Sequence, residues 1–125
     1  MKITTFDPHV ITEDAESAIG LFEALGFERR HKKDVDDYDT SDVRMKDANG
    51  FHVDISQTGF LAEGDRIAIR MNVDDFDEAY QMLADRGFRN LYGKQSVSTE
   101  TSRSAMMVSP SGFTINLVHH IKKDR

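Results

Sequence analysis

The 125-residue chain has no cysteine and no long apolar run. Without cysteine it cannot use thiol catalysis, zinc–thiolate ligation or disulfide cross-links. This composition is compatible with a reducing compartment, and we expect a cytoplasmic location. The first residues lack the basic segment and apolar run of a signal peptide, and no apolar run approaches the roughly 20 residues needed to span a bilayer. We therefore expect no membrane partner.

The chain also has fewer basic than acidic residues. Sixteen Lys and Arg residues against 22 Asp and Glu residues give a formal net charge of −6. An acidic chain repels phosphate backbones, and its basic residues are scattered apart from residues 28–33 and 122–125. We therefore expect no nucleic-acid partner. The length suits one domain, or two small halves that share a core.

The chain contains an internal repeat, because residues 14–27 are matched by residues 75–88, 61 positions later. Each copy begins with an aspartate that can cap a helix and continues with apolar residues at helical spacing. Each copy ends with a glycine followed by a phenylalanine, as helix C-termini often do. The repeat extends beyond these helices, since Gly50 is matched by Gly112, 62 positions later. A nearly constant offset over a whole half indicates a duplicated module.

Alternating and β-branched residues predict strands around the two helices. The predicted strands cover residues 3–12, 27–35, 43–46, 51–57, 66–73, 88–92, 104–109 and 113–119. Pro8 predicts an edge position or a bulge in the first strand. The order is βαβββ twice, with module one at 1–58, a linker at 59–64 and module two at 65–121. The long polar segments 36–41 and 93–103 are candidate lids.

Three short motifs connect this order to a known family: Leu25-Gly26-Phe27, then residues 73–79, then the turn Ser109-Pro110-Ser111-Gly112-Phe113. With the repeat, they make nearly the whole chain resemble the vicinal oxygen chelate superfamily of glyoxalases, extradiol dioxygenases, fosfomycin-resistance transferases and bleomycin-resistance proteins. The resemblance implies an α+β fold in which two tandem βαβββ modules form a curved mixed sheet. It does not identify a reaction, because one scaffold hosts many chemistries.

In that family the sheet curls into a cup with the helices on its convex side, so alternation along each strand separates inward from helix-facing residues. The predicted helix-facing residues are Phe6, Val10, Phe51, Val53, Ile55, Ile67, Ile69, Met71, Val73, Phe113, Ile115 and Leu117. The predicted ligand-binding residues inside the cup are Asp7, His9, His52, Asp54, Ser56, Ala68, Arg70, Asn72, Thr114 and Asn116. The Arg70 guanidinium can bind a carboxylate or phosphate of a ligand with two hydrogen bonds. Alternatively it forms an internal pair with Asp54 or Asp7.

The resemblance also implies four metal-ligand positions, which in this chain are Asp7, Asp54, Ala68 and Asn116. Alanine has no donor atom, and zinc, nickel and iron favour nitrogen ligands that this set lacks. We therefore expect no metal cofactor, and the sequence identifies no catalytic residues. An alternative set of His9, His52 and Asp54 becomes available if the first strand shifts by two residues at Pro8.

These observations predict a metal-free small-molecule-binding protein of the bleomycin-resistance type, with a small organic ligand held in the cup of the paired modules. The alternative is a metal-dependent enzyme, a glyoxalase-like lyase or isomerase or a dioxygenase, that uses the alternative His/Asp site. We also expect a homodimer, because the edge strands of each half invite pairing. Sedimentation at micromolar concentration that gives the monomer mass would contradict the dimer. The sequence leaves open whether the modules pair within one chain or are swapped between two.

Overall fold

The computed structural model describes residues 1–29, 42–59, 64–91, 93, 97–98 and 102–120. The chain divides into two compact units. The first unit is Asp7–Ile67, and the second unit is Met1–Phe6 together with Ala68–Arg125.

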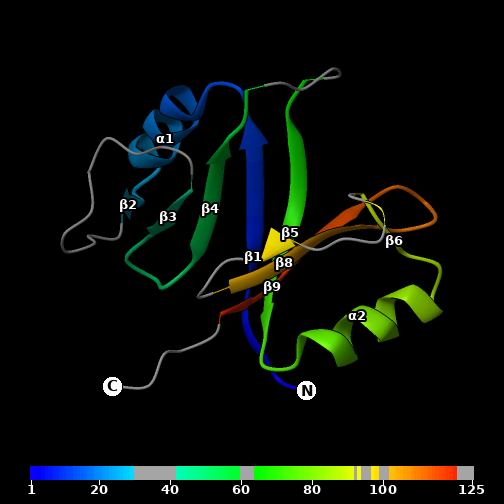
Figure 1. Ribbon diagram of the computed structural model, residues 1–125. Helices are drawn as coiled ribbons and strands as arrows, with labels where there is room; N and C mark the ends of the chain where they lie inside the picture. Colours follow the sequence, from blue (N-terminus) through cyan, green and yellow to red (C-terminus); the bar gives the residue numbers. More distant parts are fainter. Residues whose placement is uncertain (30–41, 60–63, 92, 94–96, 99–101, 121–125) are drawn as a thin grey trace. The chain divides into compact units, whose positions relative to one another are not determined.

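The first unit is a helix packed on a small mixed sheet. Its elements are β1 (Ile3–Thr12, which begins in the second unit), α1 (Ala15–Ala24), β2 (Glu28–Arg29), β3 (Val43–Lys46) and β4 (His52–Gln57). The strand order is β2-β3-β4-β1, in which β4 and β1 are parallel and the other pairs are antiparallel. Figure 1 shows α1 beside β3 and β4. The buried apolar cluster consists of Ala15, Ile19, Val43, Met45, Val53 and Ile55.

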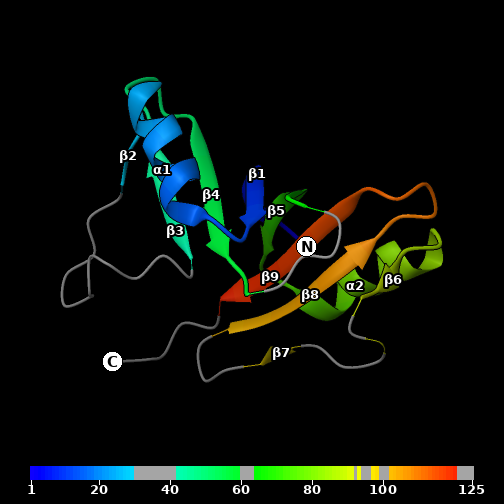
Figure 2. The same ribbon diagram turned by 90° about the horizontal axis from the view of Figure 1, so that it is seen from above.

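The second unit repeats this plan. Its further elements are β5 (Arg66–Val73, which begins in the first unit), α2 (Phe76–Asp85), β6 (Arg89–Asn90), β7 (Val97–Ser98), β8 (Ser102–Val108) and β9 (Thr114–His120). The order is β5-β9-β8-β6, with β5 and β9 parallel and with β7 also paired to β8. Figure 2 shows α2 alongside β8 and β9. The buried apolar cluster consists of Met71, Val73, Phe76, Ala79, Ala105, Met107, Ile115 and Leu117.

The predicted α+β class is confirmed, because each unit joins one helix to a mixed sheet. The βαβββ order is found in the first unit, and the second unit adds to it the short strand β7, which was not predicted. The module bounds of 1–58 and 65–121 stay predictions. Residues 30–35 of the second predicted strand and the candidate lid at 36–41 lie outside the described residues. The other candidate lid, 93–103, is described only in part, and there it contributes β7 and the start of β8. No helix of the described residues has the length and apolarity to cross a membrane.

The helix ends form the caps that the repeat predicts. The Asp14 carboxylate accepts from the Ser17 amide at 3.2 Å and from the Ser17 hydroxyl at 2.7 Å. In the second copy, Asp75 accepts from the Glu78 amide at 3.1 Å. The C-terminal glycines Gly26 and Gly87 have φ angles of +101° and +90°, which L side chains rarely adopt.

The cap at Asp14 predicts a defined pH dependence. The hydrogen bonds from the Ser17 side chain and then from the Ser17 amide hold the pKa of Asp14 below its ordinary value. The ionised cap therefore stabilises the fold above the pKa of the unfolded chain, and this stability is lost as the pH falls through the lowered folded-state pKa. Asparagine caps a helix about as well but does not titrate. Thermal melts from pH 7 down to pH 3 should therefore fall less steeply for Asp14→Asn than for the unmodified chain; parallel curves would contradict this role.

The prediction was wrong for four of the helix-facing residues, which are exposed instead of buried. The exposed fractions of Phe6, Phe51, Ile67 and Phe113 are 63%, 66%, 63% and 53%. A helix is shorter than a strand of the same number of residues. A ten-residue helix covers about 15 Å, whereas a ten-residue strand extends about 33 Å, so side chains beyond the helix stay uncovered. Neither Phe6 nor Ile67 joins an apolar cluster, and both stand where the chain passes between units.

Candidate functional site

The sheet face of the first unit that lies opposite α1 is polar. His9 pairs with Asp54 across β1 and β4, and Arg44 pairs with Asp54 across β3 and β4. Paired residues project to the same side of a sheet, and residues two apart along a strand share a face. The predicted ligand-binding residues of this unit therefore share one face with Arg44: Asp7, His9, His52, Asp54 and Ser56. Their neighbours Val53 and Ile55 pack against α1, as predicted.

Arg44 is the central cation of this face. Its Nε donates to Asp54 Oδ1 at 3.2 Å, and its Nη2 donates to Asp54 Oδ2 at 3.1 Å. The same Nη2 lies 3.9 Å from Asp7 Oδ1. Asp54 and Asp7 are only 2% and 6% exposed, so the guanidinium compensates two buried carboxylates. A fork-to-fork arrangement of this kind is the strongest form of an arginine–carboxylate pair.

The charge on Arg44 is secured despite its burial. Desolvation disfavours the guanidinium cation, but the hydrogen bond and charge of Asp54, followed by the charges of Asp7 and Asp42, outweigh it and raise the pKa of Arg44. The sequence suggested an internal pair with Asp54 or Asp7 only as one alternative for Arg70, and Arg44 was not considered. The signal was present, because Arg44 stands between the buried residues Val43 and Met45 and must project to the opposite face.

A histidine and a serine meet beside this ion pair. His9 is 3% exposed, and its Nε2 forms a hydrogen bond of 2.7 Å with Ser56 Oγ. The Ser56 hydroxyl also lies 3.4 Å from Asp42 Oδ1, to which it can donate. When it does so, its oxygen is left to accept from His9 Nε2. The face thus offers polar groups that are already oriented by one another.

The corresponding face of the second unit carries the other predicted residues. Across the parallel pair β5–β9, Ala68 pairs with Thr114 and Arg70 with Asn116, and Asn72 follows two residues after Arg70. Ala68, Arg70, Asn72 and Thr114 are all buried, and Asn116 is half-buried.

Arg70 is oriented by two polar neighbours within this unit. Its Nε donates to Asn72 Oδ1 at 2.9 Å, and its Nη2 lies 3.4 Å from His120 Nε2. Arginine only donates, so His120 accepts with an unprotonated nitrogen. His120 is exposed, and it lies on the same face as Asn116, four residues away along β9. The alternation along β9 is the signal that could have identified it.

A bound metal ion requires several side-chain donors grouped around one point. The positions implied by the family resemblance contribute Asp54, which Arg44 already binds with both oxygens, and Ala68, which has no donor. Within the described residues, no three His, Cys, Asp or Glu side chains are grouped closely enough to hold a metal ion, so His9, His52 and Asp54 form no such group. The residues present therefore do not fit the metal centre that the family resemblance implies.

Comparison with known proteins gives a likeness of fold. No protein-family profile matches the chain, and no curated protein sequence matches it. Among solved structures, a glyoxalase/bleomycin resistance protein/dioxygenase superfamily member from Vibrio splendidus 12B01 has a TM-score of 0.61 at 19% identity, over 94% of this chain and 99% of that chain. The methylmalonyl-CoA epimerase of Mycobacterium tuberculosis has a TM-score of 0.66 at 18% identity, over 96% and 90%. A variant of the Streptomyces coelicolor methylmalonyl-CoA epimerase, in complex with 2-nitronate-propionyl-CoA, has a TM-score of 0.62 at 17% identity, over 97% and 100%.

Proposed function

Because the chain has the fold of the glyoxalase/bleomycin resistance protein/dioxygenase superfamily, we propose that it is a metal-free protein that binds a small organic ligand on its polar sheet faces. The observation that carries this proposal is the pairing of Arg44 with Asp54 and Asp7. The Arg44 guanidinium supplies positive charge that compensates these buried carboxylates. A cation built into the chain supports a face that stays folded without a metal.

The chemistry of Arg70 indicates the class of ligand. Its guanidinium is held by Asn72 and faces His120, so its orientation is fixed before a ligand arrives. A preorganised guanidinium binds a carboxylate or a phosphate with two parallel hydrogen bonds. We therefore expect the ligand to carry one such anionic group beside an organic body that can contact Met106, the half-buried residue paired with Asn116.

The test is a thermal-shift screen of small organic carboxylates and phosphate esters, followed by isothermal titration of each compound that raises the melting temperature. Binding is expected to be unchanged in the presence of a chelator. Arg70→Gln should weaken it by about tenfold or more, because a charge-assisted pair is lost. The matched control is Arg86→Gln, which removes an exposed arginine at the end of α2.

Two results would overturn the proposal. The first is a loss of binding when metal is removed, which favours the metal-dependent lyase, isomerase or dioxygenase. The second is equal weakening by Arg70→Gln and Arg86→Gln, which shows that the anion is bound elsewhere.

A further inference from the structure

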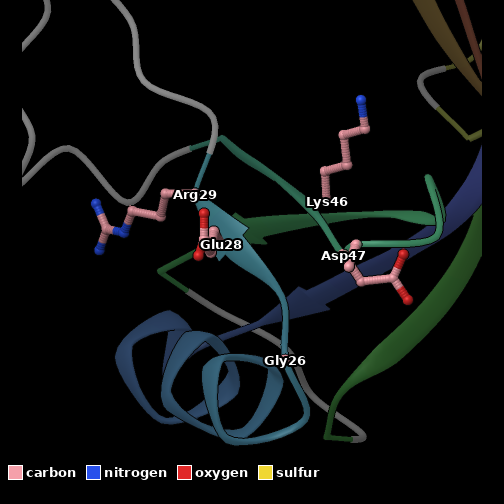
Figure 3. A pocket seen from close by; sticks show the side chains of 6 residues that line it. Gly26, Glu28, Arg29, Lys46 and Asp47 are labelled. Atoms are coloured by element: carbon pink, nitrogen blue, oxygen red, sulfur yellow. The ribbon is translucent and has the colours of Figure 1, made fainter.

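A pocket of about 380 Å³ lies at the C-terminal end of α1 in the first unit. It is lined by Gly26, Glu28, Arg29, Lys46, Asp47 and Ala48. Figure 3 shows Gly26 at the end of the helix, with Glu28 and Lys46 on neighbouring strands. Its volume is within the range of small-molecule sites.

The internal repeat shows that this space is filled in the second unit. Gly87 is the counterpart of Gly26, and a Cβ on Gly87 would meet Pro110 Cγ at 2.8 Å. A Cβ on Gly26 would meet nothing within 4 Å. The counterpart of Pro110 is Ala48, 62 positions earlier. The pocket therefore includes the space beside Gly26 that the Pro110 ring occupies at the equivalent position of the second unit.

The two turns have the same backbone, so the difference comes from their side chains. In the first unit the Asp47 amide donates to Phe51 and the Gly50 amide to Asp47, at 3.0 and 3.1 Å. In the second unit the matching bonds, from Ser109 to Phe113 and from Gly112 to Ser109, are 2.8 and 3.0 Å. Ala48 and Pro110 thus occupy the same turn position, the one that favours proline.

The aromatic residues follow the same contrast. In the second unit Phe88 and Phe113 pack edge to face with centroids 5.6 Å apart. In the first unit Phe27 packs instead on Phe22, at 5.5 Å, and Phe51 is 66% exposed. The counterparts of Phe88 and Phe113, which are Phe27 and Phe51, therefore do not form the same aromatic pair in the first unit.

The open copy carries a pair of opposite charges that the filled copy lacks. Glu28 faces Lys46 across β2 and β3, and the counterparts across β6 and β8 are Arg89 and Val108. Both Glu28 and Lys46 are exposed, and within the described residues they form no ion pair with each other. The carboxylate of Asp47 is already used by its turn, because it accepts from the amides of Asn49 and Phe51 at 2.9 Å each.

We propose that this pocket is a second binding site, for a zwitterion of amino-acid size with a compact apolar body. The ligand carboxylate meets Lys46, its ammonium meets Glu28, and its apolar body fills the space that the Pro110 ring takes in the other unit. L-Proline is the natural probe, because its ring copies that filling group. A ligand this small is expected to bind with a dissociation constant of about 1 mM.

The experiment is a titration of the isotope-labelled chain with L-proline, followed by the amide signals of Gly26, Glu28 and Ala48. We expect saturable shifts at these residues, and Lys46→Gln should weaken binding about threefold to fivefold, because an exposed ion pair contributes about 1 kcal/mol or less. L-Prolinamide, which lacks the carboxylate, should bind as weakly as L-proline binds to the Lys46→Gln variant. Absence of saturable shifts, or equal binding of L-proline and L-prolinamide, would overturn the proposal.

Two proline variants serve as matched controls. Ala48→Pro should close the pocket and abolish the shifts, while a thermal melt no lower than that of the unmodified chain shows that the fold is kept. Pro110→Ala should open the equivalent space in the second unit, but no L-proline shifts should follow at Gly87, because Arg89 and Val108 supply no opposite charges. Shifts that persist in Ala48→Pro would refute the site. If this second site is refuted, the proposal that a ligand binds on the polar sheet faces still stands, because it rests on Arg44 and Arg70.

Discussion

Replacing Arg44 by methionine is expected to lower the free energy of unfolding by about 3 kcal/mol at pH 7, because removing one partner of a buried pair leaves an uncompensated buried charge. Here two carboxylates lose their cation, since Arg44 contacts both Asp54 and Asp7. The loss should shrink below about pH 4, where carboxyl groups become protonated and need no cation. Urea denaturation at the two pH values measures both effects.

Two further variants make the Arg44 result specific. Arg44→Met with Asp54→Leu should recover part of the loss, because replacing both partners of a buried pair by apolar groups is often neutral, whereas Asp7 stays buried without its cation. Arg103→Met removes an arginine that binds the exposed Asp77 at 3.0 Å, and an exposed pair of this kind contributes about 1 kcal/mol or less. If Arg44→Met and Arg103→Met have equal effects, Arg44 does not compensate a buried charge.

Replacing Ile55 by alanine is expected to cost about 3 kcal/mol, because a fully buried side chain leaves both lost burial and a cavity. Ile55 is 0% exposed and belongs to the cluster beneath α1. The same substitution at Ile67, which is 63% exposed, should change the free energy of unfolding by no more than about 0.5 kcal/mol. The two variants remove the same atoms, so chemical denaturation of both isolates burial. Similar losses at the two positions would show that Ile67 is covered in solution and that its assignment as exposed is wrong.

Local signals in the sequence were sufficient for the elements. The capping aspartates Asp14 and Asp75 and the glycines Gly26 and Gly87 mark the helix ends through contacts within a few residues. The strand bounds at Val43–Lys46 and Arg66–Val73 were predicted correctly. Period-two alternation also separated the polar from the apolar face correctly in the middle of the strands.

The same alternation failed where burial depends on how far a helix reaches. Phe51 follows the apolar pattern of Val53 and Ile55 but stands just before β4 begins, and it is exposed. Nothing in the local pattern gives the length of strand that a ten-residue helix can cover. Whether a helix covers a given strand residue depends on how the helix and the sheet pack, which the local sequence pattern does not show.

The partners within the candidate site depend on strand register, which the sequence does not give. Asp54 could be paired with an arginine on any neighbouring strand, and Arg70 was considered because alternation along its strand places it inside the cup. The pairing of β3 with β4 instead places Arg44 opposite Asp54. The register between strands therefore decides which arginine compensates which buried carboxylate.

The polar sheet faces are proposed to bind a small organic ligand without a metal ion. The most direct test of this proposal is the elemental analysis, by mass spectrometry, of protein purified without a histidine tag and passed through gel filtration. The expected transition-metal content is far below one ion per chain. A single kind of metal ion retained at one per chain would contradict the proposal.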